Sequence, residues 1–268
     1  MASRIAVVLT HGRHEEVQVA ARTLERIAAE IGVTLVDGDN DRSADGEAEI
    51  AIALGGDGTI LSGLRRFSDT GVPVFAVNFG QVGFLATIER DACEDGFRRA
   101  FTGQFERLEL PAIGIAAPGL RQSAINDVSL LRHPGGRVAV LSYVLGSEEL
   151  GHVRCDGLVV ATPAGSTGYN LANGGPVLAW GVEGYVVTFI APHSLTARPL
   201  VVAPGDTLTL LNRSARESVD VAVDGRNVGE LAPGDSLDCR FRHGAALLAQ
   251  LPNSSFYQRL REKFGHLV

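Results

Sequence analysis

The pattern of hydrophobic residues changes near residue 110, and this change constrains the fold more than any other feature of the sequence. Before it, continuous apolar runs alternate with segments whose apolar residues recur at helical spacing. Such runs are typical of strands buried on both faces, so the alternation predicts a parallel α/β sheet. The expected strands are residues 5–9, 33–36, 50–54 and 73–77.

After Pro111, short apolar stretches are separated by Gly, Pro, Asn and Asp residues, which predicts a mainly all-β domain. One exception is the segment that begins at Ser166, where a short helix could start. The expected strands are residues 112–117, 123–131, 138–145, 157–161, 185–190, 206–211, 218–223, 236–241 and 245–250.

These patterns divide the 268 residues into an α/β domain at 1–110, a β-rich domain at 111–250 and an amphipathic tail at 251–268. The charge distribution supports the first boundary, because acidic residues outnumber basic ones before residue 110 and balance them after it. The tail is expected to return to the N-terminal domain. Asp91 is the expected cap of a helix that ends near Gly103.

Composition excludes several classes of protein. The net charge of −7 leaves no basic surface for nucleic acid or anionic lipid at the level of the whole chain. Lys263 is the only lysine, so the chain lacks the lysine of a Walker loop, a protein kinase or a Schiff-base enzyme. The sequence also contains no G-x-G-x-x-G and no G-x-S-x-G, which argues against a Rossmann dehydrogenase and a serine hydrolase.

The cysteines and the apolar runs indicate a cellular location. Cys93, Cys155 and Cys239 form neither a C-x-x-C metal site nor a disulfide framework, which favours a reducing compartment. No run approaches the ~20 apolar residues of a membrane helix, and the apolar run at the N-terminus is too short for a signal peptide. We therefore expect a cytoplasmic protein with no membrane partner.

A glycine-rich loop that contains a carboxylate is the first candidate site. It lies between an expected strand and an expected helix, at the edge where open α/β sheets bind ligands, although it also fits a tight turn. Its glycines and the helix N-terminus suit a phosphate group, but a carboxylate there repels phosphate unless it holds a cation or accepts a proton. We interpret Asp57 as orienting a substrate hydroxyl and finally accepting its proton, while magnesium neutralises the transferring phosphate. The loop consists of Gly55, Gly56, Asp57, Gly58 and Thr59.

Three further polar clusters follow along the chain. Asn126 and Asp127 suit the vicinal hydroxyls of a ribose, but a turn is the alternative, and both side chains reach one site only at a bulge or strand end. The segment from Arg154 to Asn170 offers small residues, hydroxyls and Tyr169, which could cover a planar base; the alternative is a polar loop. Asp224 and Gly225 are expected to form a hairpin turn.

Taken in order, six segments resemble the NAD kinase family. The long block DGLVVATPAGSTGYNLANGGP discriminates best, because diacylglycerol kinases, sphingosine kinases and phosphofructokinases are similar at the first segment alone. Gly168 stands where the family usually has alanine, and Arg226 where it often has glutamine. The segments are Gly55–Thr59, Asn78–Leu85, Asn126–Asp127, Asp156–Pro176, Pro192–Leu200 and Asp224–Gly225.

The resemblance implies phosphorylation of the adenosine ribose 2′-hydroxyl of NAD by ATP or polyphosphate, giving NADP. It also implies a divalent metal ion, with Mg²⁺ expected, and a homodimer or homotetramer. By position, Asp57 matches the family's proton acceptor, Gly58 matches its neighbour in the loop, and Phe84 matches an aromatic residue near the adenine. Asn126 and Asp127 match the ribose-binding pair, Arg154 and Asp156 match dinucleotide contacts, and Asp224 matches a further polar contact. The base-binding segment is matched by Thr167, Gly168, Tyr169, Asn170, Leu171 and Ala172.

Two other functions remain open at this point. A lipid or sphingoid-base kinase would share only the glycine-aspartate loop and would need an apolar channel, against which the polar residues 162–170 argue. A non-catalytic dinucleotide sensor would bind NADP without turnover, which would leave Asp57 without a chemical purpose.

Overall fold

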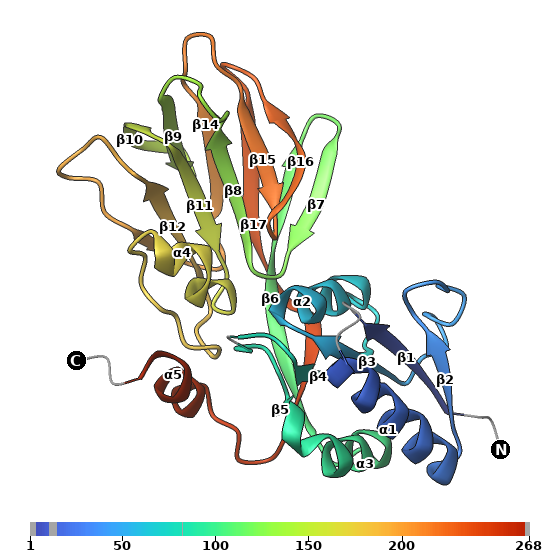
Figure 1. Cartoon of the computed structure of the whole chain (residues 1–268). Helices are drawn as coiled ribbons and strands as arrows, with labels where there is room; N and C mark the ends of the chain where they lie inside the picture. Colours follow the sequence, from blue (N-terminus) through green and yellow to red (C-terminus); the bar gives the residue numbers. More distant parts are fainter. Residues whose placement is uncertain (1–3, 11–14, 82, 266–268) are drawn as a thin grey trace. The chain divides into compact units, whose positions relative to one another are not determined.

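The computed structural model describes residues 4–10, 15–81 and 83–265, and the chain divides into two compact units. Unit 1 comprises Met1–Leu110 and Gly244–Val268, and unit 2 comprises Pro111–His243. Figure 1 shows strands alternating with helices in unit 1 and a mainly β unit 2. The predicted fold class, an α/β domain with a parallel sheet followed by a mainly all-β domain, is confirmed, and the strands of the second domain pair antiparallel.

The sheet of unit 1 is parallel and buried. Its strands lie in the order β2-β1-β3-β4, and the C-terminal part of β17 continues it, with Leu247 opposite Pro73 of β4. Every residue of β3 and β4 is buried, which accounts for their continuous apolar sequences. The strands are β1 (Arg4–Thr10), β2 (Val33–Asp37), β3 (Ile50–Gly55), β4 (Pro73–Asn78), the short β5 (Ile88–Glu89) and β17 (Ser236–Gln250).

Three helices follow strands of this sheet: α1 (Glu15–Ile31), α2 (Asp57–Arg66) and α3 (Cys93–Thr102). The predicted cap of α3 is wrong. A 3₁₀ turn at Arg90–Ala92 leads directly into α3, so Ala92 is the N-cap, with no side-chain capping bond, and Asp91 lies inside the turn. The predicted end at Gly103 is confirmed, with φ of +72°.

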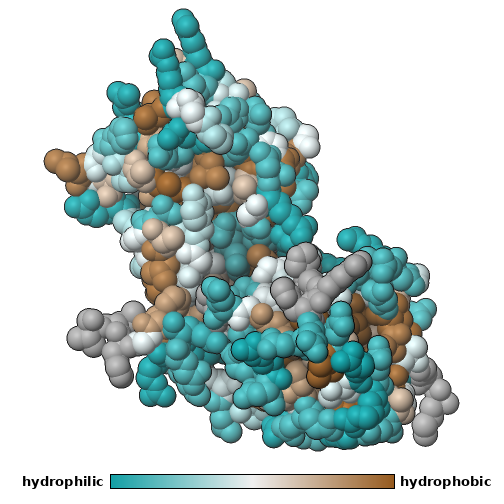
Figure 2. Space-filling model, in the orientation of Figure 1, coloured by the Kyte–Doolittle hydropathy of each residue, from teal (hydrophilic) through white to brown (hydrophobic). Residues whose placement is uncertain are grey.

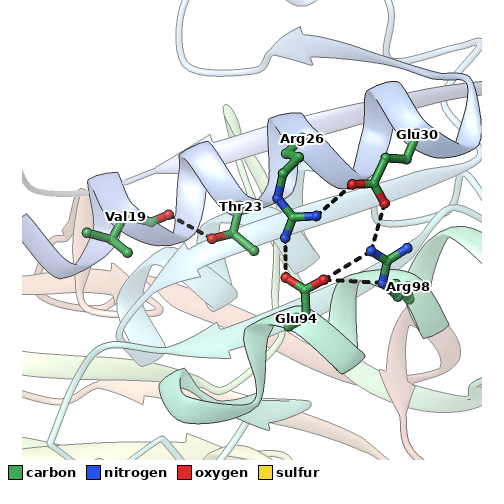
Figure 3. Close-up of polar contacts among 6 residues, drawn as sticks. All are labelled: Val19, Thr23, Arg26, Glu30, Glu94 and Arg98. Carbon is green, nitrogen blue, oxygen red and sulfur yellow. Dashed lines mark hydrogen bonds and ion pairs between the residues drawn. The ribbon is translucent and has the colours of Figure 1, made fainter.

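A network of four charged side chains joins the outer faces of α1 and α3 (Figure 3). Arg26 binds Glu30 at 2.6 Å and also contacts Glu94, while Arg98 binds Glu30 at 2.7 Å and Glu94 at 3.0 Å. All four side chains are substantially exposed, so each pair adds little stability by itself. The helices are held mainly by the apolar residues beneath the network, among them Leu24, Ile27 and Phe97.

Unit 2 is built from antiparallel strands whose buried side chains form one large core cluster and a small second one. One sheet has the order β13-β12-β11-β8-β15-β16, and the other contains β10-β9-β14 followed by the N-terminal part of β17. The strands are β6 (Glu106–Ala117), β7 (Leu120–Ala124), β8 (Asp127–Arg132), β9 (Ala139–Leu145), β10 (Glu148–Cys155), β11 (Gly157–Ala161), β12 (Tyr185–Ile190), β13 (Leu200–Val202), β14 (Thr207–Asn212), β15 (Val219–Val223) and β16 (Arg226–Leu231).

The C-terminal tail packs within unit 1, as predicted. Its helix α5 (Phe256–Phe264) is capped by Ser255, whose hydroxyl accepts the Gln258 N–H at 3.0 Å. Its apolar face contacts the ring of Phe84. In Figure 2, hydrophilic residues cover most of the visible surface of both units. Within the described part of the chain, no helix has the length and apolar character that crossing a membrane requires.

Candidate active site

The glycine-rich loop joins β3, which ends at Gly55, to α2, which begins at Asp57. A Cβ on Gly55 would lie 2.2 Å from the Thr59 hydroxyl, and one on Gly56 would lie 3.4 Å from Gly80. Gly58 is exposed, with nothing within 4 Å of its Cβ position. Packing therefore requires a small residue at Gly55, whereas Gly58 leaves an open surface beside the first turn of α2, where backbone N–H groups suit an anion.

The carboxylate of Asp57 is held by two backbone N–H groups of a second loop. Oδ2 accepts from Gly83 and Oδ1 from Leu85, each at 3.1 Å. Gly83 has φ of +63°, and a Cβ there would overlap the side chain of Asn78, so only glycine fits. The half-buried Asp57 is thus fixed in orientation while its remaining lone pairs stay available for other partners.

Asn78 frames the same loop from the end of β4. Its Oδ1 accepts the Gly80 N–H at 2.9 Å, and its Nδ2 donates to Glu89 at 2.8 Å. The segment Asn78–Leu85, which the sequence singled out only by resemblance, therefore positions Asp57. Val82, within this segment, lies outside the described residues. The detectable signal in the sequence is the pair of glycines, Gly80 and Gly83, that follows a buried strand.

Phe84, expected near the adenine, is only 4% exposed. Its ring lies 5.7 Å from that of Phe256 and 5.9 Å from that of Phe264, both on α5. This aromatic residue thus joins the Asp57 loop to the C-terminal helix, and little of its surface is exposed.

In unit 2, Asn126 and Asp127 lie at a strand end, the arrangement that both side chains need to reach one site. Strand β7 ends at Ala124, and β8 begins at Asp127. Asp224 holds this corner: its carboxylate accepts the N–H groups of Ile125 at 3.2 Å, Asn126 at 2.7 Å and Asp127 at 3.2 Å. Asp224, predicted as a polar contact, therefore organises the corner itself.

Asp224 can do this because it sits in a tight turn. Asp224 and Gly225 have φ of +48° and +74°, and they form the two-residue hairpin between β15 and β16 that the sequence predicted. The N–H of Asp224 donates to the Asp127 carbonyl at 2.8 Å, which ties the turn to the start of β8. Arg226, which follows the turn, is exposed.

The corner contains a buried carboxyl group with a raised pKa and a buried amide oxygen. Asp127 is 8% exposed, and burial together with the charge of Asp224 raises its pKa to about 7. The amide oxygen of Asn126 is also buried, and among the described residues it has no hydrogen-bond partner. The Asn126 oxygen is therefore a buried acceptor that a ligand could satisfy.

The segment after β11 packs directly on this corner. Thr162 donates its N–H to the Asn126 carbonyl at 2.9 Å and its hydroxyl to the Ile125 carbonyl at 2.6 Å. A Cβ on Gly165 would lie 2.0 Å from the Asn126 carbonyl oxygen. The small residues of this block therefore allow two backbone segments to approach each other.

The predicted base-binding segment contains one fully buried polar side chain, that of Asn170, and one exposed aromatic ring, that of Tyr169. Asn170 is fully buried; its Nδ2 donates to the carbonyls of Ser166 and Pro176, and its Oδ1 accepts the Thr188 hydroxyl at 2.7 Å. Tyr169 is 40% exposed. Of the other predicted residues, the Thr167 hydroxyl donates to Ala164, Leu171 is half-buried, and Gly168 and Ala172 are exposed.

Electrostatics place Tyr169 near two of the predicted carboxylates. Burial raises the pKa of its phenol, and the negative charges of Asp127 and Asp156 raise it further. Asp156 in turn accepts a hydrogen bond from Arg132 Nε at 2.5 Å, which lowers the pKa of its carboxyl. Arg132 lies at the end of β8, and its role is visible only once β8 and β11 are paired.

Arg154 is exposed on the edge strand β10, and its carbonyl accepts the His193 N–H at 2.7 Å. The structure thus gathers Asn126, Asp127, Asp156, Tyr169 and Asp224 within unit 2. Asp57, Gly58 and Phe84 belong to unit 1.

One group of three side chains among the described residues could hold a metal ion: His133, Asp220 and Glu230, whose ligand atoms lie within 4.8 Å of one another. This group does not match the expected magnesium site. A nitrogen ligand suits zinc better than magnesium. In addition, His133 follows one end of β8, whereas Asp127 lies at the other end. Magnesium in kinases is held mainly by substrate phosphates, waters and one or two carboxylates, a requirement that the single carboxylate Asp57 fits.

Comparison with known families covers both units. Residues 5–105 match the ATP-NAD kinase N-terminal domain, and residues 125–249 match the ATP-NAD kinase C-terminal domain. The chain is 37% identical over 222 residues to the NAD kinase of Gemmatimonas aurantiaca, covering 80% of this chain and 76% of that protein. It is 34% identical over 227 residues to the NAD kinase of Rhodopirellula baltica, covering 83% and 73%.

Two solved structures are similar along nearly the whole chain. The NAD kinase of Archaeoglobus fulgidus in complex with ATP has a TM-score of 0.75 at 26% identity and covers 98% of this chain and 97% of that one. The yeast NADH kinase complexed with NADH has a TM-score of 0.86 and covers 99% and 88%; at 20% identity it shows the shared fold alone.

Proposed function

Since the chain belongs to the NAD kinase family, we propose that it transfers the terminal phosphoryl group of ATP to the adenosine ribose 2′-hydroxyl of NAD, giving NADP, with Asp57 as proton acceptor. Polyphosphate is the alternative donor. Phosphotransfer itself follows from the family, whereas the roles of individual residues and of the metal ion are the proposal.

The fixed carboxylate of Asp57 is the observation that carries the proposal. Both of its oxygens are oriented by backbone N–H groups, at the first turn of a helix that follows a glycine-rich loop. Phosphoryl transfer depends chiefly on positioning the nucleophile and on stabilising charge, and the proton leaves the hydroxyl late. A carboxylate held in this way can accept a hydrogen bond from the attacking hydroxyl, orient it, and finally take its proton.

The corner around Asn126 and Asp127 supplies the groups that would bind the ribose and its neighbours. The Asn126 amide oxygen can accept a hydrogen bond from a hydroxyl group, and a protonated Asp127 can donate one to a hydroxyl oxygen. Tyr169 offers an exposed ring on which a planar base can stack. Thr167, Gly168, Asn170, Leu171 and Ala172 would shape that base-binding segment, and Arg154 and Asp156 would contact the dinucleotide. Asp224 would act by holding the corner.

A divalent cation, with Mg²⁺ expected, would neutralise charge on the donor phosphates when bound. The open surface at Gly58 and the first turn of α2 would hold phosphate oxygens, together with the backbone of Gly55, Gly56 and Thr59. We further propose that the protein is cytoplasmic and forms a homodimer or homotetramer. Light scattering of the purified protein would test the oligomeric state.

The test is product formation by the purified protein. Incubation with NAD, ATP and MgCl₂ should yield NADP, measured with a dehydrogenase that accepts NADP only, which also reports that the phosphate is at the 2′ position. Parallel reactions with polyphosphate and with NADH define the donor and acceptor. Absence of NADP under every donor, with NADP still bound in calorimetry, would indicate the dinucleotide sensor instead; phosphorylation of a diacylglycerol would indicate a lipid kinase.

A further inference from the structure

One peptide group lies between Asp57 and an arginine of the C-terminal helix. The peptide joins Phe84 to Leu85: its N–H donates to Asp57 Oδ1 at 3.1 Å, and its carbonyl oxygen accepts from Arg259 Nη1 at 3.3 Å. The same guanidinium nitrogen also donates to the carbonyl of Ala86. A cation and a carboxylate thus hold opposite ends of one peptide unit.

The guanidinium itself is held in place. Arg259 Nη2 donates to Gln250 Oε1 at 2.5 Å, at the end of β17. Burial lowers the pKa of Arg259, while the charges of Glu89, Glu262 and Asp57 oppose that effect, so the field of Asp57 reaches the guanidinium. Arg259 remains charged, because an arginine guanidinium is not deprotonated in proteins.

The docking of α5 has other sources. Phe256 and Phe264 pack on Phe84 on the apolar side, and Lys263 binds Glu89 at 2.7 Å. Loss of the guanidinium would therefore leave these contacts of the helix in place and remove its bonds to the Phe84 and Ala86 carbonyls, together with the bond to Gln250. A variant that lacks the guanidinium can therefore test whether Arg259 orients the loop, without removing the contacts that hold α5.

We propose that Arg259 is a positioning residue for Asp57, acting through the Phe84–Leu85 peptide and making α5 a part of the catalytic apparatus. The inference rests on the proposed role of Asp57. A cation at the carbonyl end polarises the peptide, which strengthens the hydrogen bond from its N–H to the carboxylate. It also fixes the loop on which the carboxylate rests, and small displacements of a catalytic group are costly in rate.

The test compares three substitutions on one helix. Arg259→Gln should lower kcat by roughly 10- to 100-fold, the scale of a modest misplacement of a catalytic group, and leave KM for NAD within about threefold. Arg259→Lys, which keeps the charge, should recover part of the loss. Arg261→Gln is the matched control: it removes the same charge from an exposed position of α5, and kcat should not change.

A double-mutant cycle distinguishes positioning from general weakening of the fold. In an Asp57→Asn background, Arg259→Gln should cause no further loss of kcat, because its effect passes through the carboxylate. An equal loss in both backgrounds would overturn the inference, as would wild-type kcat in Arg259→Gln while Asp57→Asn is inactive. Full activity of Asp57→Asn would instead refute the proposed role of Asp57 and leave the kinase activity itself standing.

Hydrogen exchange gives a readout independent of activity. The Leu85 amide should exchange faster in Arg259→Gln than in Arg261→Gln, because the loop is released. Should Arg259→Gln not fold, the same comparison is made with Arg259→Lys. Unchanged exchange at Leu85 in the folded variant would show that Arg259 does not hold the peptide.

Discussion

Two carboxylates of this enzyme, Asp57 in unit 1 and Asp127 in unit 2, occupy opposite environments. Asp57 is half-buried and each of its oxygens accepts a backbone N–H, with no second carboxylate among its hydrogen-bond partners in the described part of the chain. Asp127 is almost fully buried beside the carboxylate of Asp224, and its pKa rises to about 7.

Because their environments differ, the two aspartates are suited to different chemistry. Backbone N–H groups orient a carboxylate as a hydrogen-bond acceptor, whereas burial near a like charge favours a protonated carboxyl group that can donate. Carboxyl groups whose environments differ in this way suit different chemical roles. We therefore expect substitutions at Asp57 to change turnover and substitutions around Asp127 to change binding and stability.

The strongest test of this division is Asp57→Asn. The amide has nearly the same shape but cannot accept a proton, so kcat should fall by roughly 10³-fold, within the usual range for loss of a general base. KM for NAD should change little. Steady-state kinetics with NAD varied at saturating ATP measure both. If KM rises and kcat is retained, Asp57 binds substrate and the contrast with Asp127 disappears.

The next largest effect is expected from Gly165→Ala in unit 2. Its Cβ would lie 2.0 Å from the Asn126 carbonyl oxygen, so one backbone segment must move. We expect a loss of roughly 1–3 kcal/mol in the free energy of unfolding, as for other overpacked sites, and a raised KM for NAD. Urea unfolding measures the first effect.

Gly205→Ala is the matched control for that substitution. It lies in the same unit, and nothing is within 4 Å of its Cβ position. Its stability should stay near that of the wild type. Equal stability of the two variants would mean that the corner tolerates displacement, which would weaken the argument that it is preorganised.

The pH dependence of stability isolates Asp127. Its folded pKa of about 7 lies above the model-peptide value of 3.8, so between those pH values the folded state holds a proton that the unfolded state has released. The contribution of Asp127 to stability therefore falls as pH rises through this window and is constant above it. Asp127→Asn should remove that fall.

The measurement is urea unfolding of wild type and Asp127→Asn at pH 5 and pH 8. The variant should gain stability relative to the wild type at pH 8, by on the order of a few kcal/mol, and this gain should be smaller at pH 5. All other titrating groups are common to both proteins, so the difference reports Asp127. A difference that is independent of pH would show that Asp127 is ionised in the folded state.

The fold and the polar clusters could be predicted because their signals are local. Buried strands such as β3 and β4 have continuous apolar sequences, and Asp224-Gly225 is a typical hairpin turn. Strands β10, β13 and β16 were not predicted. Each lies at the edge of its sheet. In β10 and β16 exposed polar residues interrupt the apolar signal, whereas β13 is apolar but only three residues long.

Partners that are far apart in the sequence could not be predicted. The expected stretches 236–241 and 245–250 form one strand, because β17 continues through Arg242–Gly244. Arg132 pairs with Asp156 only because β8 and β11 are neighbours, and Arg259 reaches the Phe84 carbonyl from 175 residues away. No local pattern encodes such contacts.

The smallest expected effect concerns Tyr169, which lies in unit 2 with Asp127 and is expected to affect binding rather than turnover. Its ring is 40% exposed and lies in the field of Asp127 and Asp156. If a base stacks on it, Tyr169→Leu should raise KM for NAD by roughly 5- to 10-fold, which corresponds to about 1 kcal/mol of aromatic contact, and leave kcat unchanged. Tyr169→Phe keeps the ring and should behave as the wild type. A loss of kcat in Tyr169→Leu, or an equal rise of KM in both variants, would contradict a stacking role and leave the phenol hydroxyl as the functional group.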